Sequence, residues 1–369
     1  MKIFLKKLCL FLIPIAAIFI FPIIIFIVGR EYYSAEHAAE TQMIRPETLF
    51  GLAYTDENKS YKEALIAKLD PEILVLGTSR SGQFRSDLFK KENHFGNASN
   101  AVTSISEMKQ FIEHLPNSST KIIMLGLDQE MFFKDIPKPD QNGIFDRFKN
   151  LFVASWKSPY EDYYYGKFSL SELQKQSVET TSIGLNALVN GRGFRSDGSF
   201  RDGKKLDETL APQVAIDIGK EVSEIQNNRG SFLYGEQMRQ KDLDDLASIL
   251  ELCKKRGIYA IGFLPPYPKA FYDEYARVDD IYRQQISNLP AAISDIFSQY
   301  HFGFFDFSDI GIVQAPDSEF SDIRHGTDKI YLRMTIYMAE KNKMLKQYVD
   351  ILKLKKILVE NKKDFLDVQ

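Results

Sequence analysis

Ser79 stands where a serine could act as a nucleophile. It follows the short apolar stretch Ile73 to Leu76 and precedes the polar turn formers Arg80, Ser81 and Gly82. Such a stretch predicts a buried β-strand, and a serine in the turn after a strand can point its hydroxyl out of the backbone toward a substrate. Because a serine hydroxyl is a weak nucleophile, this chemistry requires a nearby base that takes its proton.

His325 is the histidine best suited to be that base. Asp322 precedes it by three residues, and we expect this spacing to put the carboxylate and the imidazole on the same side of one helical turn. The carboxylate would then fix the tautomer of the ring, as in a Ser-His-Asp triad. The other histidines are less suitable: His37 adjoins the apolar N-terminal segment, His94 is in a loop, His114 is on a predicted helix and His301 precedes a strand.

Each of these residues also has a purely structural interpretation. Ser79 could cap the N-terminus of a helix, since Gly-Thr-Ser is common there, and Asp322 with His325 could cap the C-terminal helix. Asp322, His325 and Asp128 could instead bind a metal, although a set with one histidine is a poor zinc site. The order of serine, aspartate and histidine along the chain favours the triad, so we expect neither a metal nor another cofactor.

Alternating strands and helices predict the fold that would position these residues. The pattern indicates an α/β fold, a three-layer sandwich with a parallel sheet, whose ligands bind at the carboxyl ends of the strands. Gly77 to Ser79, Gly126 to Asp128 and Pro265 to Tyr267 are expected at that edge. The predicted strands are 72–76, 121–125, 258–264 and 302–307, and the predicted helices are 104–115, 241–256, 280–300 with a break near Pro290, and 329–354.

The chain between residues 132 and 239 interrupts this pattern. It is rich in Tyr, Phe, Ser, Gly and Asp and contains the only tryptophan, Trp156, so we interpret it as one large insertion over the core. Within it, Gly193 to Gly203 carries two Asp-Gly turn signals, which favour a surface hairpin. A sugar-binding loop or a calcium site is the alternative, but the acidic ligands are few.

The N-terminal segment determines the expected location. Residues 8–28 contain no charged residue, and 21 helical residues can cross the hydrocarbon layer of a bilayer. Three lysines precede them, which predicts a cytoplasmic N-terminus and an extracytoplasmic remainder. A cleaved signal peptide is the competing interpretation, but no small-residue cleavage site follows closely. We expect a single-pass membrane anchor at 1–30, a lead-in segment at 31–70 and the α/β domain at 71–369.

Composition argues against a nucleic-acid partner. The 47 Lys and Arg against 50 Asp and Glu give a net charge of −3, without a long basic run. The apolar residues, 44% of 369, are ample for a packed core. Cys9 and Cys253 lie in the apolar segment and in a predicted helix, so no disulfide is expected.

Ser79 and the late Asp-x-x-His together resemble the SGNH, or GDSL-like, hydrolase superfamily. That family places its nucleophile after the first strand in a Gly-Asp-Ser block and an Asp-x-x-His before a final helix. The corresponding residues are Gly77-Thr78-Ser79 and Asp322-x-x-His325, and the resemblance covers about 71–128 and 241–345. An α/β-hydrolase is disfavoured, because its nucleophile follows several strands and its acid lies far from its histidine in sequence.

The resemblance also implies where oxyanion donors should lie. The nearest counterparts of the family's Asn-x-Gly-like and Gly-x-Asn-Asp blocks are residues 97–100 and 126–129. Asp128 replaces the family's asparagine, and an ionised carboxylate there would repel an oxyanion. Another residue then supplies the donor, or Asp128 points elsewhere, or catalysis is weak. Candidates for oxyanion or substrate binding are Asn97, Ser99, Asn100, Asp128, Gln129 and Arg80, the last expected in a salt bridge, with a clamp for a substrate carboxylate as the alternative.

The resemblance and the expected location imply a function. An anchored, outward-facing enzyme of this kind would move or remove a short acyl group, such as acetyl, on a cell-envelope or exported glycan. Anchored relatives often act in polysaccharide acetylation beside a multispanning membrane protein that supplies the acyl group, so such a partner is expected by analogy. The alternative, favoured by Asp128 and the aromatic insertion, is a catalytically silent envelope protein that binds glycan or scaffolds an assembly.

Overall fold

The apolar stretches predicted as strands join in one parallel sheet in the computed structural model. The strand order is β2-β1-β3-β6-β7, and every pairing is parallel. The sequence does not predict β2, which contains no β-branched residue and pairs with β1 through its backbone. The strands are β1 (Ile73–Gly77), β2 (Phe95–Ser99), β3 (Ile122–Gly126), β6 (Tyr259–Leu264) and β7 (Gly303–Asp306).

The chain is divided into two units. Unit 1 comprises residues 1–57, 137–196 and 201–205, and unit 2 comprises residues 58–136, 197–200 and 206–369. The expected lead-in at 31–70 is split between them, because Tyr61, Leu65 and Ile66 are buried in unit 2. The structure describes residues 2–90, 94–116, 119–133, 153–203, 211–226, 238–278, 280–361, 363 and 366.

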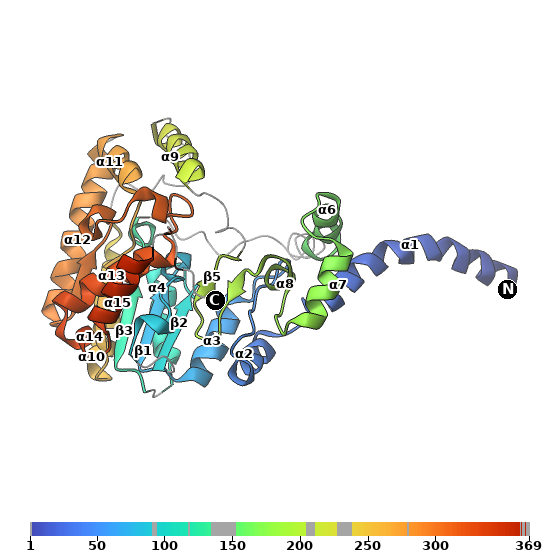
Figure 1. Cartoon of the computed structure of the whole chain (residues 1–369), viewed down its shortest axis with the longest axis horizontal. Coiled ribbons are helices and arrows are strands. Elements are labelled where there is room, and N and C mark those ends of the chain that lie inside the picture. The colour runs from blue at the N-terminus through green and yellow to red at the C-terminus, as the bar shows by residue number, and fades with distance from the viewer. Residues whose placement is uncertain are drawn as a thin grey trace. The chain divides into compact units, whose positions relative to one another are not determined.

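Helices of unit 2 cover both faces of the sheet (Figure 1). Leu74 and Leu76 of β1 pack with α4, α10 and α12 on one face, and Ile73 and Val75 pack with α13 and α15 on the other. This alternation is what a strand buried on both sides requires. These helices are α4 (Ile105–His114), α10 (Gln240–Lys255), α12 (Asp280–Gln299), α13 (Asp328–Lys341) and α15 (Ile351–Glu360).

Two helix predictions need correction. Pro290 lies inside α12 without ending it. The single helix expected at 329–354 is divided into three, because the side chains of Asn342 and Asp350 cap two new helices. Unit 2 also contains α3 (Asn58–Leu69), α9 (Ala211–Gln226), α11 (Lys269–Val278), α14 (Lys343–Lys346) and the 3-10 helices η1 (Ser79–Ser81), η2 (Ser86–Leu88), η4 (Gln129–Phe132), η7 (Ile310–Val313) and η8 (Asp317–Glu319).

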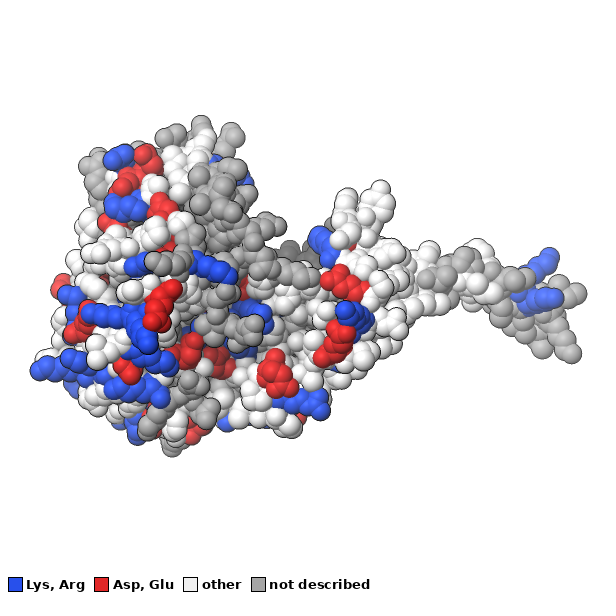
Figure 2. All heavy atoms as spheres, viewed as in Figure 1, with Lys and Arg blue, Asp and Glu red and all other residues white. Residues whose placement is uncertain are grey.

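The described part of unit 1 is mostly helical. Phe11–Val28 of its first helix is long and apolar enough to span a membrane, and this helix carries charged side chains only near its N-terminal end (Figure 2). The helices are α1 (Lys2–Val28), α2 (Ala35–Ile44), the π-helix η5 (Val153–Lys157), α6 (Ser158–Tyr164), α7 (Leu170–Glu179) and α8 (Leu185–Asn190). A two-stranded sheet, β4 (Gly193–Phe194) with β5 (Phe200–Arg201), forms where the sequence predicts a hairpin.

Lys62 of α3 is fully buried next to strand β2. Its Nζ donates hydrogen bonds to the backbone carbonyls of Asn97 (3.0 Å) and Gly198. Burial lowers the pKa of Lys62 well below its ordinary value, although the charge of Asp197 opposes this effect. The folded protein therefore favours the neutral amine.

Protein stability should consequently rise with pH while Lys62 titrates. The unfolded chain keeps the Lys62 proton up to its ordinary pKa of 10.5, whereas the folded chain releases it at lower pH. The free energy of unfolding therefore increases between the two pKa values. Urea denaturation at a series of pH values measures this slope, and Lys62→Met should flatten it. An unchanged slope in the variant would contradict a neutral Lys62.

Candidate active site

Ser79 lies at the carboxyl end of β1, next to the ends of β2 and β3. Thr78 caps η1, because its hydroxyl accepts a hydrogen bond from the backbone N–H two residues later (3.2 Å). Ser79 is therefore not the cap, and its side chain is exposed. This leaves the Ser79 hydroxyl available for chemistry at the edge of the sheet where ligands are expected.

Asp322 and His325 lie in a closed loop before α13. The backbone N–H and the hydroxyl of Ser321 both donate to the carbonyl of His325, at 2.8 and 3.1 Å. Residues 321–324 are bends, so the expected helical turn is wrong. The loop folds back on itself and so brings the two side chains together. A spacing of three residues permits this contact in such a loop as well as in a helical turn.

The structure brings Ser79, His325 and Asp322 together. Ser79 Oγ lies 2.8 Å from His325 Nε2, and His325 Nδ1 lies 2.9 and 3.0 Å from the two carboxylate oxygens of Asp322. Since a carboxylate can only accept hydrogen bonds, Nδ1 carries the ring proton and Nε2 is left to accept the proton of Ser79. This is the arrangement that activates a serine nucleophile.

Asp322 is held in its ionised form. Burial opposes ionisation, but the hydrogen bond and the charge interaction with His325 outweigh it. The backbone N–H groups of Arg324 and His325 add hydrogen bonds of 2.9 and 2.8 Å to the same carboxylate. Together they hold the pKa of Asp322 well below its ordinary value, so the carboxylate keeps the imidazole oriented throughout the neutral pH range.

Arg80 is buried and joins three parts of the site. Its guanidinium donates to the carbonyls of Pro265 (3.0 Å), Pro266 (2.7 Å) and Arg324 (3.2 Å). It also lies over the ring of Tyr267, 4.3 Å from the ring centre. These contacts connect the end of β1, the end of β6 and the loop that carries His325. With only 4% of its surface exposed, Arg80 positions these segments and is closed to a substrate carboxylate.

Two of the predicted oxyanion donors are used elsewhere. Asn97 Nδ2 donates to two backbone carbonyls at 2.9 Å each, and Gln129 Nε2 donates to Ser308 Oγ (2.9 Å) and to a backbone carbonyl (3.3 Å). Both side chains are buried. Their amides therefore hold loops in place and do not reach a substrate.

Asn100 is the predicted donor best placed to reach a substrate. It directly follows β2, is partly exposed and has a φ of 62°. This left-handed conformation favours glycine and asparagine. The register pairs Gly77 with Ser99, so Asn100 and Ser79 leave neighbouring strands at the same edge. The Ser99 hydroxyl itself is buried, with no hydrogen-bond partner among the described residues.

Asp128 is buried after β3, and its two carboxyl oxygens differ. Oδ2 accepts a hydrogen bond from the hydroxyl of Thr78 (2.7 Å), whereas Oδ1 is buried without a partner in the part of the chain that the structure describes. Burial raises the pKa of Asp128, although the charge of Arg80 and the Thr78 hydrogen bond oppose this. Asp128 is therefore connected to the turn that carries Ser79 through its hydrogen bond with Thr78.

A cavity of about 210 Å³ adjoins the triad. It is lined by residues of α9 and of the 322–325 loop, so the stretch interpreted as an insertion contributes to the site. Val214, Ile218 and Val222, spaced by four, are the signal that could have predicted α9. Arg324, which sequence reasoning missed, pairs with Glu130 at 3.3 Å. The lining residues are Asp217, Lys220, Glu221, Asp322, Ile323, Arg324 and His325.

Metal binding by Asp322, His325 and Asp128 finds no support in the geometry. Among the described residues, no three His, Cys, Asp or Glu side chains are grouped closely enough to hold a metal ion.

The chain matches no protein-family model, and no curated protein matches its sequence.

Proposed function

We propose that this chain is a serine esterase or acyltransferase that forms an acyl-enzyme on Ser79. The contact of 2.8 Å between Ser79 Oγ and His325 Nε2 carries the proposal. As Ser79 Oγ attacks an ester carbonyl, its proton passes to His325 Nε2, which then gives it to the departing alcohol. Water or a sugar hydroxyl, deprotonated by the same nitrogen, attacks the acyl-enzyme and frees Ser79.

The surroundings of the triad favour a short acyl group on a polar carrier. Ser79 is exposed, and the small cavity beside His325 is lined mainly by charged side chains. A long acyl chain would require an apolar lining, whereas sugar hydroxyls can hydrogen-bond with charged groups. Together with the resemblance to SGNH hydrolases, this favours an acetyl group on a cell-envelope or exported glycan.

A membrane anchor completes the proposal. Helix α1 is long and apolar enough to span a bilayer, and its lysines lie at its N-terminal end. An excess of lysine marks the cytoplasmic side, so unit 2 would lie outside the cytoplasm. By analogy with anchored relatives in the superfamily that the chain resembles, the partner would be a multispanning membrane protein that supplies acyl groups.

A fluorophosphonate probe tests the proposal. The full chain in detergent should be labelled, because the activated Ser79 oxygen attacks phosphorus and displaces fluoride. Ser79→Ala should abolish the labelling, whereas Ser86→Ala, which removes a serine of η2 outside the triad, should leave it unchanged. Absence of labelling in a wild-type protein with a normal circular dichroism spectrum would instead support the catalytically silent binding protein.

A further inference from the structure

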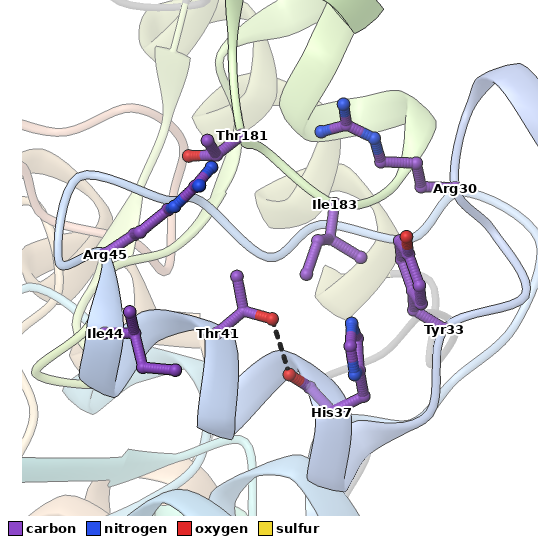
Figure 3. Close-up of a pocket in the computed structure, with 8 residues that line it drawn as sticks. All are labelled: Arg30, Tyr33, His37, Thr41, Ile44, Arg45, Thr181 and Ile183. Carbon is purple, nitrogen blue, oxygen red and sulfur yellow. Dashed lines mark hydrogen bonds between the residues drawn. The ribbon is translucent and has the colours of Figure 1, made fainter.

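A second pocket lies in unit 1, in the segment that directly follows α1 (Figure 3). Its volume is about 380 Å³, which is in the range of ligand sites. Two arginines and one histidine line it, and none of the eight lining residues is acidic. The lining therefore carries positive charge that no carboxylate within it neutralises. The lining residues are Arg30, Tyr33, His37, Thr41, Ile44, Arg45, Thr181 and Ile183.

Arg30 is held in a fixed position by neutral acceptors. Its Nη1 donates to the carbonyls of Thr180 (3.0 Å) and Ser182 (2.7 Å), and its Nη2 donates to the carbonyl of Ser177 (2.7 Å). These carbonyls lie at and just beyond the C-terminal end of α7, where the helix dipole favours a cation. The three bonds orient the guanidinium without cancelling its full positive charge.

Arg45 and an aromatic pair line other parts of the pocket. Arg45 follows the last residue of α2, and its side chain extends toward Thr181 (Figure 3). The rings of Tyr33 and His37 stack with 4.4 Å between their centres. In the view of Figure 3, Ile183 lies between Arg45 and this stack. The pocket thus combines two guanidinium groups, a phenol and an imidazole with two isoleucine side chains.

The pocket lies close to the C-terminal end of α1, where this helix would leave a bilayer. Arg30 lies two residues beyond the end of α1, in the turn that follows the helix. The apolar span is Phe11–Val28. Lipid headgroups lie immediately on the water side of the hydrocarbon, so they would lie just beyond Val28.

We infer that this pocket binds the phosphate of a lipid headgroup. Guanidinium groups bind phosphate through charge-assisted, often bidentate hydrogen bonds, and the Tyr33 hydroxyl can add a further donor. A soluble phosphate ester shares this chemistry, but the closeness of Arg30 to the end of α1 favours the lipid. The inference rests on the proposed membrane anchoring and is independent of the proposed esterase chemistry.

Native mass spectrometry of the full chain in detergent tests the inference with dioleoylphosphatidylglycerol as the probe. The wild type should retain the lipid, and Arg45→Gln should bind it about tenfold more weakly because one charged contact is lost. Lys175→Gln is the matched control, since Lys175 is an exposed cation of α7 that does not line the pocket. This variant should bind like the wild type, and dioleoylglycerol, which lacks the phosphate, should not bind.

Equal lipid binding by the wild type and by Arg45→Gln would overturn the inference. Tighter binding of glycerol 3-phosphate than of the lipid would also overturn it, because the site would then belong to a soluble phosphate ester. Fluorophosphonate labelling of Ser79 should persist in Arg45→Gln and in Lys175→Gln. Absence of lipid binding would therefore not contradict the proposed esterase activity. Absence of fluorophosphonate labelling in the wild type would likewise not contradict lipid binding.

Discussion

Replacing His325 with glutamine should lower the rate of aryl acetate hydrolysis by about 10⁴-fold while the protein stays folded. Glutamine can hydrogen-bond to Asp322 but cannot accept the Ser79 proton at neutral pH. Asp322→Asn should cost about 10³- to 10⁴-fold, because the amide can donate to Nδ1 and so favour the wrong tautomer of the ring. Initial rates with 4-nitrophenyl acetate measure both effects.

Two comparisons make this result specific to the triad. His114→Gln changes an exposed histidine of α4, bonded to the carbonyl of Gln110, and should hydrolyse the ester at the wild-type rate. The double variant Ser79→Ala, His325→Gln should be no slower than either single variant, because the two residues act as one unit. Multiplicative losses in the double variant, or wild-type rates in His325→Gln, would contradict the assignment of the base.

Local sequence signals account for the part of the fold that could be predicted. The apolar runs that become β1, β3 and β6 are recognisable alone, because strands buried on both faces need continuous apolar residues. Strand β2 lacks this signal. Its glycine, asparagine and serine form a strand only because they pair in register with β1. The residues of β2 alone do not indicate this pairing.

In the candidate site, too, contacts between residues close in sequence could be predicted, and contacts between distant segments could not. The spacing of Asp322 and His325 predicts that they are close, but not the bends that join them. The partners of Arg80 and Asn97 could not be predicted, because they lie on segments brought together only by the fold. Arg80 and Pro265 are 185 residues apart, and nothing in the sequence around either residue indicates their hydrogen bond.

Replacing Asp128 with asparagine should stabilise the protein at alkaline pH. Burial raises the pKa of Asp128, so between the ordinary value of 3.8 and this raised pKa the folded chain holds a proton that the unfolded chain has lost. Stability contributed by the protonated form therefore falls as pH rises through this window. An asparagine side chain cannot ionise, and we expect the free energy of unfolding at pH 8 to increase by about 1–3 kcal/mol. Urea denaturation at pH 4 and pH 8 measures the difference, which should be smaller at pH 4.

The same substitution, Asp128→Asn, should accelerate ester hydrolysis at pH 8 by about ten- to a hundredfold. An ionised Asp128, bonded to Thr78 beside the nucleophile, repels the oxyanion that forms when Ser79 attacks. The asparagine oxygen can still accept from Thr78, so the geometry of the turn should persist. Asp87→Asn, which neutralises a carboxylate paired with Arg85 away from the triad, is the control and should change the rate little. A slower Asp128→Asn enzyme at pH 8 would mean that the carboxyl group assists catalysis through its own charge or proton.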